Sequence, residues 1–526
     1  MLTSIGVKNL KSIKNKTSID LKPITVLLGR NSSGKSSMIR LFPLLRQSFQ
    51  EDTTGPILWY GKYADYGDYH EALTNEVDGN IELSFGLSLD LYYRKQSHLP
   101  DFPMLNFVVD LKLDSVDRKT VMREVSFSVG EIKVSILPTE QDNVVLKLTS
   151  KNISYEIPLS IYSSEDKFFP TVYFEGVDKK RKDINERWPS YYFLENSGRM
   201  YSRSVGYKSE IELNQRVCEK AADVIRGYFS ARASKKNIIK GLLDIKSYAK
   251  DRLYYTLLDS FSGHSVFINN LENKREEILD EILPFILLKG YNEIAVMLNS
   301  NLAESFLSVK YLYPIRATTE RYYRFQDLQV EEMDHTGSNV AMILNSFGES
   351  ELRLFQKWTH ENLGFIVYVQ EVGSHYAIKI KTDNDDKEHN ISDMGFGFSQ
   401  VLPIVMSIWL ETKDNSSSKG KASIFVIEQP ELHLHPAYQT QLAYLFANTI
   451  KLASKTNNNI QIIFETHSQA MIDAFGDYIE SGEISKDDVN IVFFEKNGSD
   501  GTTVKTAEFD EEGYFINWPI GFFSGK

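Results

Sequence analysis

The sequence predicts an α/β fold whose core is built from both ends of the chain, with an antiparallel β subdomain and an α-helical insertion between them. Near the start, an apolar, β-branched run over residues 24–29 leads into a loop rich in glycine and serine and then into a helix. Far downstream, residues 424–427 and 460–464 are two further short apolar runs. Continuous apolar runs of this length are typical of strands buried in a parallel sheet.

The loop after the first buried strand has the pattern G-x-x-x-x-G-K-[ST], between a strand and a helix as this motif requires. Backbone N–H groups of such a loop and the positive end of the following helix wrap a phosphate chain. The lysine reaches the β- and γ-phosphates, and the serine hydroxyl after it can ligate Mg²⁺. An incidental turn would not satisfy every fixed position. We expect a nucleoside triphosphate to bind at Gly29, Arg30, Asn31, Ser32, Ser33, Gly34, Lys35, Ser36 and Ser37.

Length and composition limit the classes of protein to which the chain can belong. A chain of 526 residues exceeds what one core usually supports, so two or more modules are expected. The one cysteine, Cys218, excludes an internal disulfide and fits a reducing cytosol. No apolar run approaches the roughly 20 residues of a membrane span, and no signal peptide is evident. We expect a cytoplasmic protein without a membrane partner.

The net charge of −12 argues against a dedicated nucleic-acid binder, which would usually be basic. Only a local patch could make such a contact, and a run of charges is more often a solvated face. Two stretches are candidates: Arg232, Lys235, Lys236, Lys240, Lys246, Lys250 and Arg252, and the run Lys179, Lys180, Arg181 and Lys182.

The middle of the chain changes pattern twice. Short alternating or β-branched runs separated by polar turns predict an antiparallel sheet from about residue 81 to 162. Helical spacing of apolar residues predicts several helices from about 209 to 300, without coiled-coil heptads. The expected modules are the first part of the core over 1–75, the antiparallel β subdomain over 76–165, a mainly helical insertion over 166–310, and the second part of the core over 311–526, with a polar linker at 414–420.

Three downstream features complement the phosphate loop. Glu428 ends an apolar strand, where a carboxylate lies beside the loop and can hold Mg²⁺ together with Ser36. His467 follows the tip of the next strand and can contact a γ-phosphate or polarise water, although a histidine standing alone would more simply be a satisfied loop residue. A second anion site is predicted ahead of a helix N-terminus, with the residues Gly395, Gly397, Ser399 and Gln400.

Together these motifs resemble the ABC-type P-loop ATPase heads of SMC-like, recombination-repair and overcoming-lysogenisation-defect proteins. By this resemblance, residues 29–36 match the first Walker motif and residues 424–428 match the second. Residues 395–400 lie where the ABC signature belongs, and residues 465–468 lie where the switch histidine belongs. Four stretches have sequences that are characteristic of stand-alone prokaryotic ATPases of the AAA family: 427–436, 313–316, 321–323 and 517–523. Among these, the chain is most similar to the ATPase subunit of Septu anti-phage defence, which also occurs as a retron effector. The resemblance covers both chain ends but not the middle.

The resemblance implies an ATP- and Mg²⁺-dependent head that dimerises head to tail, or forms a higher even oligomer. Ser399 of one copy would contact the γ-phosphate held by Lys35 of the other. It also implies control of a separate nuclease subunit of the HNH type, because no nuclease is apparent within the chain. A retron reverse transcriptase and its nucleic acid are further partners that the resemblance suggests.

One position departs from the family pattern. The residue after the Mg²⁺-binding acid is usually a glutamate that activates water, and here it is Gln429. An amide can position water but cannot act as a base. The catalytic candidates are therefore Gln429, Glu431 and His467, and slow turnover is expected.

Alternative functions remain open at this stage. A DNA-repair or chromosome-organising SMC-like ATPase would bind DNA through the helical insertion, and a transporter subunit would fractionate with membranes. The alternation of His433 and His435 provides only part of a metal-ligand set. Gln47 is a doubtful candidate for a Mg²⁺-sensing glutamine because it lies on the helix after the phosphate loop.

Overall fold

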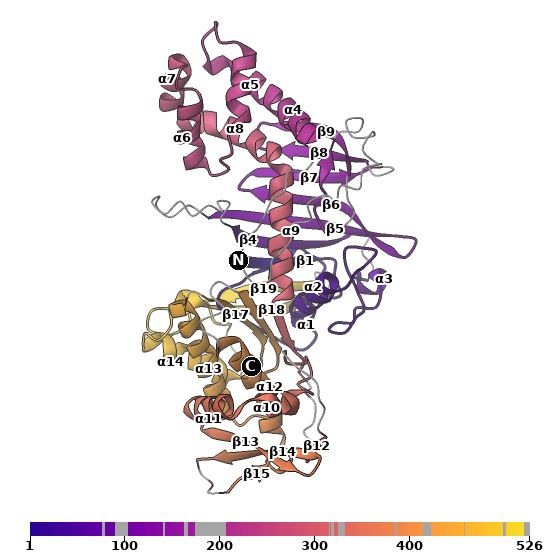
Figure 1. The fold of residues 1–526 in the computed structure, drawn as a ribbon, viewed down its shortest axis with the longest axis vertical. Coiled ribbons are helices and arrows are strands. Elements are labelled where there is room, and N and C mark those ends of the chain that lie inside the picture. The colour runs from indigo at the N-terminus through magenta and orange to yellow at the C-terminus, as the bar shows by residue number, and fades with distance from the viewer. Residues whose placement is uncertain are drawn as a thin grey trace. The chain divides into compact units, whose positions relative to one another are not determined.

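The computed structural model describes residues 1–75, 79–89, 104–139, 143–161, 167–173, 207–314, 316, 320–324, 332–383, 385, 387–413, 422–456, 458–497 and 501–519. The basic run at 179–182, the polar linker at 414–420 and the end of the 517–523 stretch lie outside these residues. The chain divides into two compact units (Figure 1). The first comprises Met1–Phe85, Asp114–Thr120 and Leu302–Lys526, and the second comprises Gly86–Leu113 and Val121–Asn301. The module boundaries expected from the sequence remain predictions.

The core of the first unit is a six-stranded sheet with the order β11-β16-β17-β3-β18-β19. Strands β11 to β18 run parallel, and β19 pairs with β18 in the antiparallel sense. The bounds are β11 (Val309–Leu312), β16 (Ala422–Glu428), β17 (Asn459–Glu465), β3 (Ile24–Gly29), β18 (Val489–Asn497) and β19 (Gly501–Ala507). A strand from the start of the chain thus lies between strands from its end.

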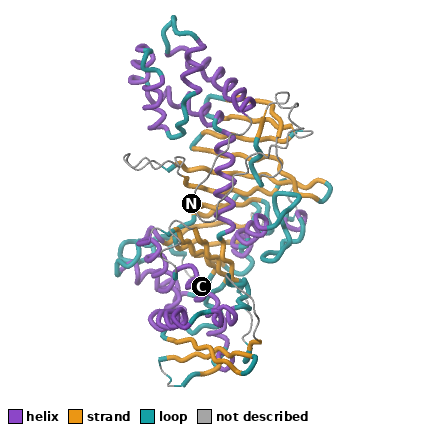
Figure 2. The backbone as a smooth tube through the Cα atoms, viewed as in Figure 1, coloured by secondary structure: helices purple, strands orange, loops and turns teal. Residues whose placement is uncertain are grey.

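Helices pack around this sheet. Helices α1 and α2 follow β3, whereas α13 and α14 pack against each other beside β17. The helices of the first unit are α1 (Lys35–Ile39), α2 (Leu41–Gln50), α3 (Tyr69–Ala72), α10 (Val340–Ser346), α11 (Glu349–Leu363), α12 (Phe396–Thr412), α13 (Pro436–Thr456) and α14 (Gln469–Glu480). The apolar faces of α10 to α14 and the central strands form one buried cluster that includes Val26, Phe425 and Phe464, each 0% exposed. Figure 2 shows how helices and strands are distributed in each unit.

Strands of two other sheets also lie in the first unit. Strand β1 (Leu2–Lys8) forms an antiparallel pair with β2 (Thr17–Asp20), and β4 (Ile81–Leu89) lies on the other side of β1. Downstream, β13 (Phe365–Val372) and β14 (His375–Thr382) form a hairpin that carries the two-residue strands β12 (Tyr323–Arg324) and β15 (His389–Asn390).

The second unit combines an antiparallel sheet with helices. Its strands follow the order β10-β9-β8-β7-β6-β5, and β6 to β10 pair antiparallel. The strands are β5 (Leu105–Val116), β6 (Lys119–Val129), β7 (Ile132–Pro138), β8 (Asn143–Thr149), β9 (Ser154–Ile161) and β10 (Val172–Tyr173). The helices are α4 (Tyr207–Ile225), α5 (Lys235–Leu243), α6 (Lys250–Ser260), α7 (Ser265–Asn273), α8 (Arg275–Lys289) and α9 (Tyr291–Leu307).

These elements confirm the fold class predicted from the sequence. The core is a mixed α/β structure assembled from both chain ends, and the middle supplies the antiparallel strands and the helices. Every residue of β3 is buried, as are all but the first residue of β16 and of β17. Strands buried on both faces carry continuous apolar sequence, which is why the pattern was informative there.

Candidate nucleotide-binding site

The loop between β3 and α1 adopts a tight conformation that its glycines permit. The backbone is left-handed at Ser32, with φ of 61°, and at Gly34, with φ of 103°. A Cβ on Gly34 would lie 2.7 Å from Thr502 Oγ1, and one on Gly29 would lie 2.5 Å from the carbonyl oxygen of Phe494. Glycine is therefore required at both positions by the close approach of the last strands.

Lys35 is folded back over its own loop. Its Nζ donates to the carbonyl oxygens of Gly29 at 2.7 Å and Arg30 at 3.0 Å, and lies 3.6 Å from Glu465 Oε1. The residue is only 3% exposed. Burial lowers the pKa of this ammonium, and the Glu465 carboxylate opposes that shift. The loop thus holds a desolvated cation at its centre.

A cavity of about 540 Å³ opens over the loop. Residues from the start of the chain provide most of its wall, and three come from the end. It is lined by Lys11, Ser12, Asn31, Ser32, Ser33, Gly34, Lys35, Ser36, Ser37, Arg40, Asp65, Tyr66, Gln429, Glu465 and Lys496. Four of these residues carry cationic side chains, which suits a polyanionic ligand.

The residues present fit a phosphate-bearing nucleotide. The buried Ser33 Oγ, in the cavity wall, has no hydrogen-bond partner among the described residues. A buried hydroxyl without a partner is costly, and a phosphate oxygen is an acceptor that would satisfy it. Seven of the nine loop residues expected from the sequence line the cavity, while Gly29 and Arg30 supply the carbonyl oxygens that hold Lys35.

Two buried carboxylates end neighbouring strands beside the loop. Ser36 Oγ donates to Glu465 Oε2 at 3.0 Å. Glu428, which the sequence suggests as the Mg²⁺ ligand, accepts from Arg40 Nε at 2.7 Å, Arg40 Nη2 at 2.9 Å and the Tyr311 hydroxyl at 2.7 Å, and its role as a ligand remains a prediction. Burial raises the pKa of Glu465, although Lys35 and Ser36 act against this shift.

Glu431 and His467 lie together behind the loop. Glu431 Oε1 accepts from the backbone N–H of His467 at 2.7 Å, while the buried Oε2 has no partner among the described residues. Burial raises the pKa of Glu431. His467 is exposed at the surface, and partial desolvation of its ring, followed by the charge of Lys35, lowers its pKa. Neither Glu431 nor His467 is among the described residues that line the cavity.

Gln429 connects the strand ends to the cavity. Its backbone is left-handed, with φ of 46°, and its N–H donates to the carbonyl oxygen of Glu465 at 2.9 Å. Residues other than glycine rarely adopt this backbone conformation, because their Cβ atom clashes with the backbone. The turn places Gln429 in the cavity wall, as positioning of water by its amide would require.

The second predicted anion site lies elsewhere in the first unit. None of the residues expected there, Gly395, Gly397, Ser399 or Gln400, is among the described residues that line the cavity. Gly395 is exposed and precedes α12 with φ of 79°, whereas Ser399 and Gln400 are each 3% exposed. The amide of Gln400 accepts from the backbone N–H of Arg316 at 3.1 Å and donates to its carbonyl oxygen at 3.4 Å. The roles predicted for these four residues remain predictions.

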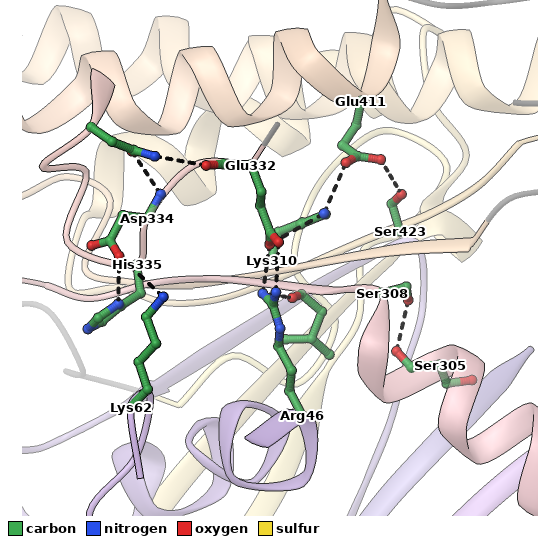
Figure 3. Close-up of polar contacts among 12 residues, drawn as sticks. Arg46, Lys62, Ser305, Ser308, Lys310, Glu332, Asp334, His335, Glu411 and Ser423 are labelled. Carbon is green, nitrogen blue, oxygen red and sulfur yellow. Dashed lines mark hydrogen bonds and ion pairs between the residues drawn. The ribbon is translucent and has the colours of Figure 1, made fainter. Parts of the chain in front are cut away.

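A polar network joins α2 to the end of α12 (Figure 3). Arg46 of α2 donates to Glu332 at 2.8 Å, and Lys310 of β11 lies 3.4 Å from Glu332 and 3.2 Å from Glu411. Glu411, near the end of α12, also accepts from Ser423 of β16 at 2.9 Å. The end of α12, the helix whose start carries most of the 395–400 segment, is thereby tied to α2.

Several site residues were missed at the sequence level. Thr502 Oγ1 donates to the carbonyl oxygen of Ser33 at 2.8 Å, and Lys496 lines the cavity; both come from the last two strands. Arg40 lies one helical turn after Ser36, and that spacing could have identified it. Tyr311 had no sequence feature that indicated its contact with Glu428.

The amide of Gln47 is fully used by the backbone. Its Nε2 donates to the carbonyl oxygens of Leu58 at 2.7 Å and Ala64 at 3.0 Å, and its Oε1 accepts from the N–H groups of Tyr63 and Ala64, each at 3.0 Å. Gln47 therefore holds the 58–64 segment.

The described residues contain neither a cluster of potential metal ligands nor a helix that could span a membrane. No group of three or more His, Cys, Asp or Glu residues there is placed to hold a metal ion, so His433 and His435 belong to no such group. No helix in the described part of the chain has the length and apolar character needed to cross a membrane.

One comparison with known proteins, the match to a family model, includes the phosphate loop. A model of the family described as the AAA ATPase domain matches residues 1–472. Among solved structures, the chain is similar to the SMC head domain from Thermotoga maritima, with 8% identity and a TM-score of 0.32 over 96% of this chain and 98% of that one, which is too weak to carry an argument. No curated protein matches the sequence. The family match includes the phosphate loop and both strand-end carboxylates, and the chain belongs to the AAA ATPase domain family.

Proposed function

We propose that the chain binds ATP with Mg²⁺ over the loop from Gly29 to Ser36 and hydrolyses it slowly. The observation that carries this proposal is the cavity at the loop, where Ser33 presents a buried hydroxyl without a partner and Lys35 presents a desolvated ammonium. A triphosphate would satisfy both groups at once.

Four residues of the site have distinct roles in this proposal. Lys35 exchanges its two backbone carbonyl partners for phosphate oxygens, and Ser36 offers a hydroxyl to the metal. Bound Mg²⁺ would neutralise charge on the phosphates. Gln429 orients the attacking water, and the unpartnered oxygen of Glu431 accepts its proton or a hydrogen bond from it. The absence of a glutamate at position 429 is the reason for expecting slow turnover.

We further propose that two copies associate head to tail around the nucleotide. The 395–400 segment lies outside the cavity wall, so in this proposal a second copy brings it to the phosphates. Gly395 is exposed and available for such a contact, together with Ser392 and Asp393. Because Ser399 is 3% exposed, its contact with a partner's nucleotide requires the start of α12 to rearrange when the copies meet.

The biological part of the proposal rests on the sequence resemblance alone. By that resemblance, the ATPase regulates a separate nuclease of the HNH type in anti-phage defence, with a retron reverse transcriptase and its nucleic acid as further partners. ATP would then act mainly as a conformational ligand that sets the state of the nuclease.

The alternative, an SMC-like ATPase whose helical insertion binds DNA directly, is also consistent with the family match, but part of its basic stretch is already paired. Three lysines of the basic stretch lie beside acidic groups of the same unit: Lys235 is 2.6 Å from Asp223, Lys250 is 2.7 Å from Glu276, and Lys246 is 4.0 Å from Glu293. Lysines that already lie beside carboxylates release fewer counterions from DNA.

The deciding experiment measures phosphate release and particle mass together, with and without ATP·Mg²⁺. We expect an even-numbered oligomer with slow turnover, lost in Lys35→Ala, raised in Gln429→Glu and reduced in Glu431→Gln without loss of nucleotide binding. Lys236→Ala, an exposed lysine outside the cavity, is the matched control. A particle mass that stays at the monomer value with and without ATP·Mg²⁺ would refute the head-to-tail association. A wild-type chain that binds no ATP would refute the whole proposal.

The nuclease partnership needs its own test. Phage plating efficiency is compared for cells that carry the chain with a candidate HNH endonuclease, as wild type and as Lys35→Ala. We expect protection only with the wild-type ATPase. Equal protection by the Lys35→Ala variant would show that nucleotide does not control the nuclease.

A further inference from the structure

Arg316 is a buried cation with few hydrogen-bond partners. The residue is 1% exposed, and its Nη2 donates to the backbone carbonyl oxygen of Glu428 at 3.1 Å. Its Nε and Nη1 have no partner among the described residues. A buried charge is costly unless it is paired and hydrogen-bonded, so this guanidinium lowers the stability of the state that the structure shows. Such a cost is typical of a residue that has a function in another state of the protein.

Glu431 lacks a partner in the complementary way. Its Oε2 is buried without a partner among the described residues, while its Oε1 accepts from the backbone N–H of His467 at 2.7 Å. Burial lowers the pKa of Arg316 to about 10, and the carboxylate of Glu431 opposes this shift more strongly than that of Glu428. Glu431 is therefore the acid whose charge acts most on the guanidinium, yet the unpartnered atoms of the two groups are not bonded to each other.

Arg316 also holds the turn on which the residues proposed to act on water lie. This 428–434 turn follows β16, and Arg316 binds its first carbonyl oxygen, that of Glu428. Gln429, proposed to orient water, and Glu431, proposed to accept from it, come next in the turn. A shift of the guanidinium would therefore change the position of both side chains.

The start of α12 fixes the backbone of Arg316. The amide of Gln400 accepts from the N–H of Arg316 at 3.1 Å and donates to its carbonyl oxygen at 3.4 Å. A Cβ on Gly397 would lie 3.1 Å from the carbonyl oxygen of His433, so the start of this helix also packs closely on the turn. A movement of the 395–400 segment is thus passed on to Arg316 and to the turn.

We propose that Arg316 is a positioning residue that couples the 395–400 segment to the 428–434 turn. When the segment rearranges around a second copy, the free nitrogen atoms of Arg316 take Oε2 of Glu431 as their partner. A carboxylate oxygen can accept two hydrogen bonds, so this contact orients Oε2 and still leaves it able to accept from water. The assignment rests on the proposed hydrolysis of ATP, and it adds the residue through which a second copy activates it.

The first test separates this role from a structural one by measuring kcat and KM for phosphate release together with thermal stability. Arg316→Met replaces a buried charge by an apolar side chain, which need not destabilise a fold. We expect kcat to fall about tenfold, KM for ATP to stay within about threefold of wild type, and the melting temperature to be no lower. Arg353→Met, at an arginine whose side chain is 77% exposed, is the matched control. An unchanged kcat, or a fall in kcat accompanied by a lower melting temperature, would overturn the proposal.

A double-mutant cycle then shows whether Arg316 acts through Glu431. Residues that act as a unit have non-additive effects, so Arg316→Met with Glu431→Gln should be no more than about twofold slower than the slower single variant. Losses of kcat that multiply would overturn the proposal. If Arg316→Met does not fold, Arg316→Lys takes its place in the cycle, since lysine keeps the charge but lacks the planar fork that binds a carboxylate.

Hydrogen exchange tests the coupling without depending on turnover. The N–H groups of Leu432 and Leu434 donate to carbonyl oxygens within the 428–434 turn, at 3.2 and 3.0 Å. Gln400→Leu removes both hydrogen bonds to the backbone of Arg316, so exchange of the turn's amides should become about threefold faster. The exposed control variant of the first test should leave it unchanged. Unchanged exchange in Gln400→Leu would overturn the coupling, whereas a wild type that binds no ATP would instead contradict the proposed function.

Discussion

The guanidinium of Arg40 and the carboxylate of Glu428 meet through two hydrogen bonds, of 2.7 and 2.9 Å, across 388 residues of sequence. Arg40 immediately follows α1, and Glu428 ends a strand from the last fifth of the chain. The hydrogen bonds to Glu428 raise the pKa of Arg40, so the guanidinium stays charged across the physiological range. The contact shows how the two ends of the chain are joined beside the phosphate loop.

We predict that Gln47 has a structural role and no role in metal sensing. Gln47→Ala removes an amide that makes four hydrogen bonds to the backbone of the 58–64 segment, and it leaves buried backbone groups without partners. The free energy of unfolding should fall by about 3 kcal/mol. Denaturant unfolding measures this change. The Mg²⁺ concentration for half-maximal phosphate release should stay at the wild-type value.

Gln50→Ala is the matched control, because Gln50 ends the same helix and is exposed. It should change stability by less than about 0.5 kcal/mol. A large shift in the Mg²⁺ requirement of Gln47→Ala, with normal stability, would restore the sensing role.

The network of Figure 3 predicts that Lys310 is a shared counterion. Lys310 lies between Glu332 and Glu411, and its side chain is 16% exposed. Lys310→Met leaves two carboxylates facing each other without this cation, so stability should fall by about 2–3 kcal/mol. Adding Glu411→Gln should recover part of the loss, and the double-mutant cycle measures the coupling.

An exposed ion pair provides the comparison for this cycle. Lys357 and Glu361 pair one helical turn apart with side chains 73% and 57% exposed. Breaking that pair should cost less than about 0.5 kcal/mol. Equal losses in Lys357→Met and Lys310→Met would mean that the network contributes no more than an ordinary surface pair.

The parts of the site that could be predicted from sequence are those that are contiguous in the chain. The residues from Gly29 to Ser36 act together because one tight loop must surround a phosphate, and buried parallel strands carry continuous apolar runs. Contacts made only by the tertiary fold were not visible. Thr502 reaches the loop across 469 residues, since β18 and β19 extend the sheet beyond β3.

The sequence also could not predict which way a polar side chain points from a correctly predicted helix or strand. Ser399 and Glu428 were correctly placed on a helix and on a strand, yet Ser399 is buried and Glu428 is paired with Arg40. Periodicity identifies an element and its buried face, but the partner of a polar side chain depends on which neighbouring element packs there.

Acid should destabilise the second unit through Glu124. Burial favours the neutral acid, but Lys112 and Lys133, each at 2.7 Å, outweigh that effect and lower the pKa of Glu124 to about 2 from 4.5. A group whose pKa is lower in the folded state adds stability that is complete above its unfolded pKa. This contribution should be lost as the pH falls from about 4.5 to about 2.

Thermal unfolding at several pH values checks this window. Glu124→Gln should be less stable than wild type at pH 7, and the difference should shrink as the pH falls through the window. Glu156→Gln, at an acid whose side chain is 54% exposed and paired with Lys147, should show a smaller difference at every pH. A difference for Glu124→Gln that does not depend on pH would contradict the prediction.

The last prediction concerns the support of the phosphate loop by β19. Thr502→Val keeps the shape of the side chain but removes the hydroxyl that donates to the carbonyl oxygen of Ser33 at 2.8 Å. A buried carbonyl that loses its donor costs about 1–2 kcal/mol, and the loop then holds its nucleotide-binding conformation less firmly. Nucleotide affinity should fall about tenfold, as measured by fluorescence titration with a labelled ATP analogue. Thr506→Val, an exposed position on the same strand, should leave the affinity at the wild-type value. Equal affinities for Thr502→Val and wild type would mean that the loop keeps its shape without β19.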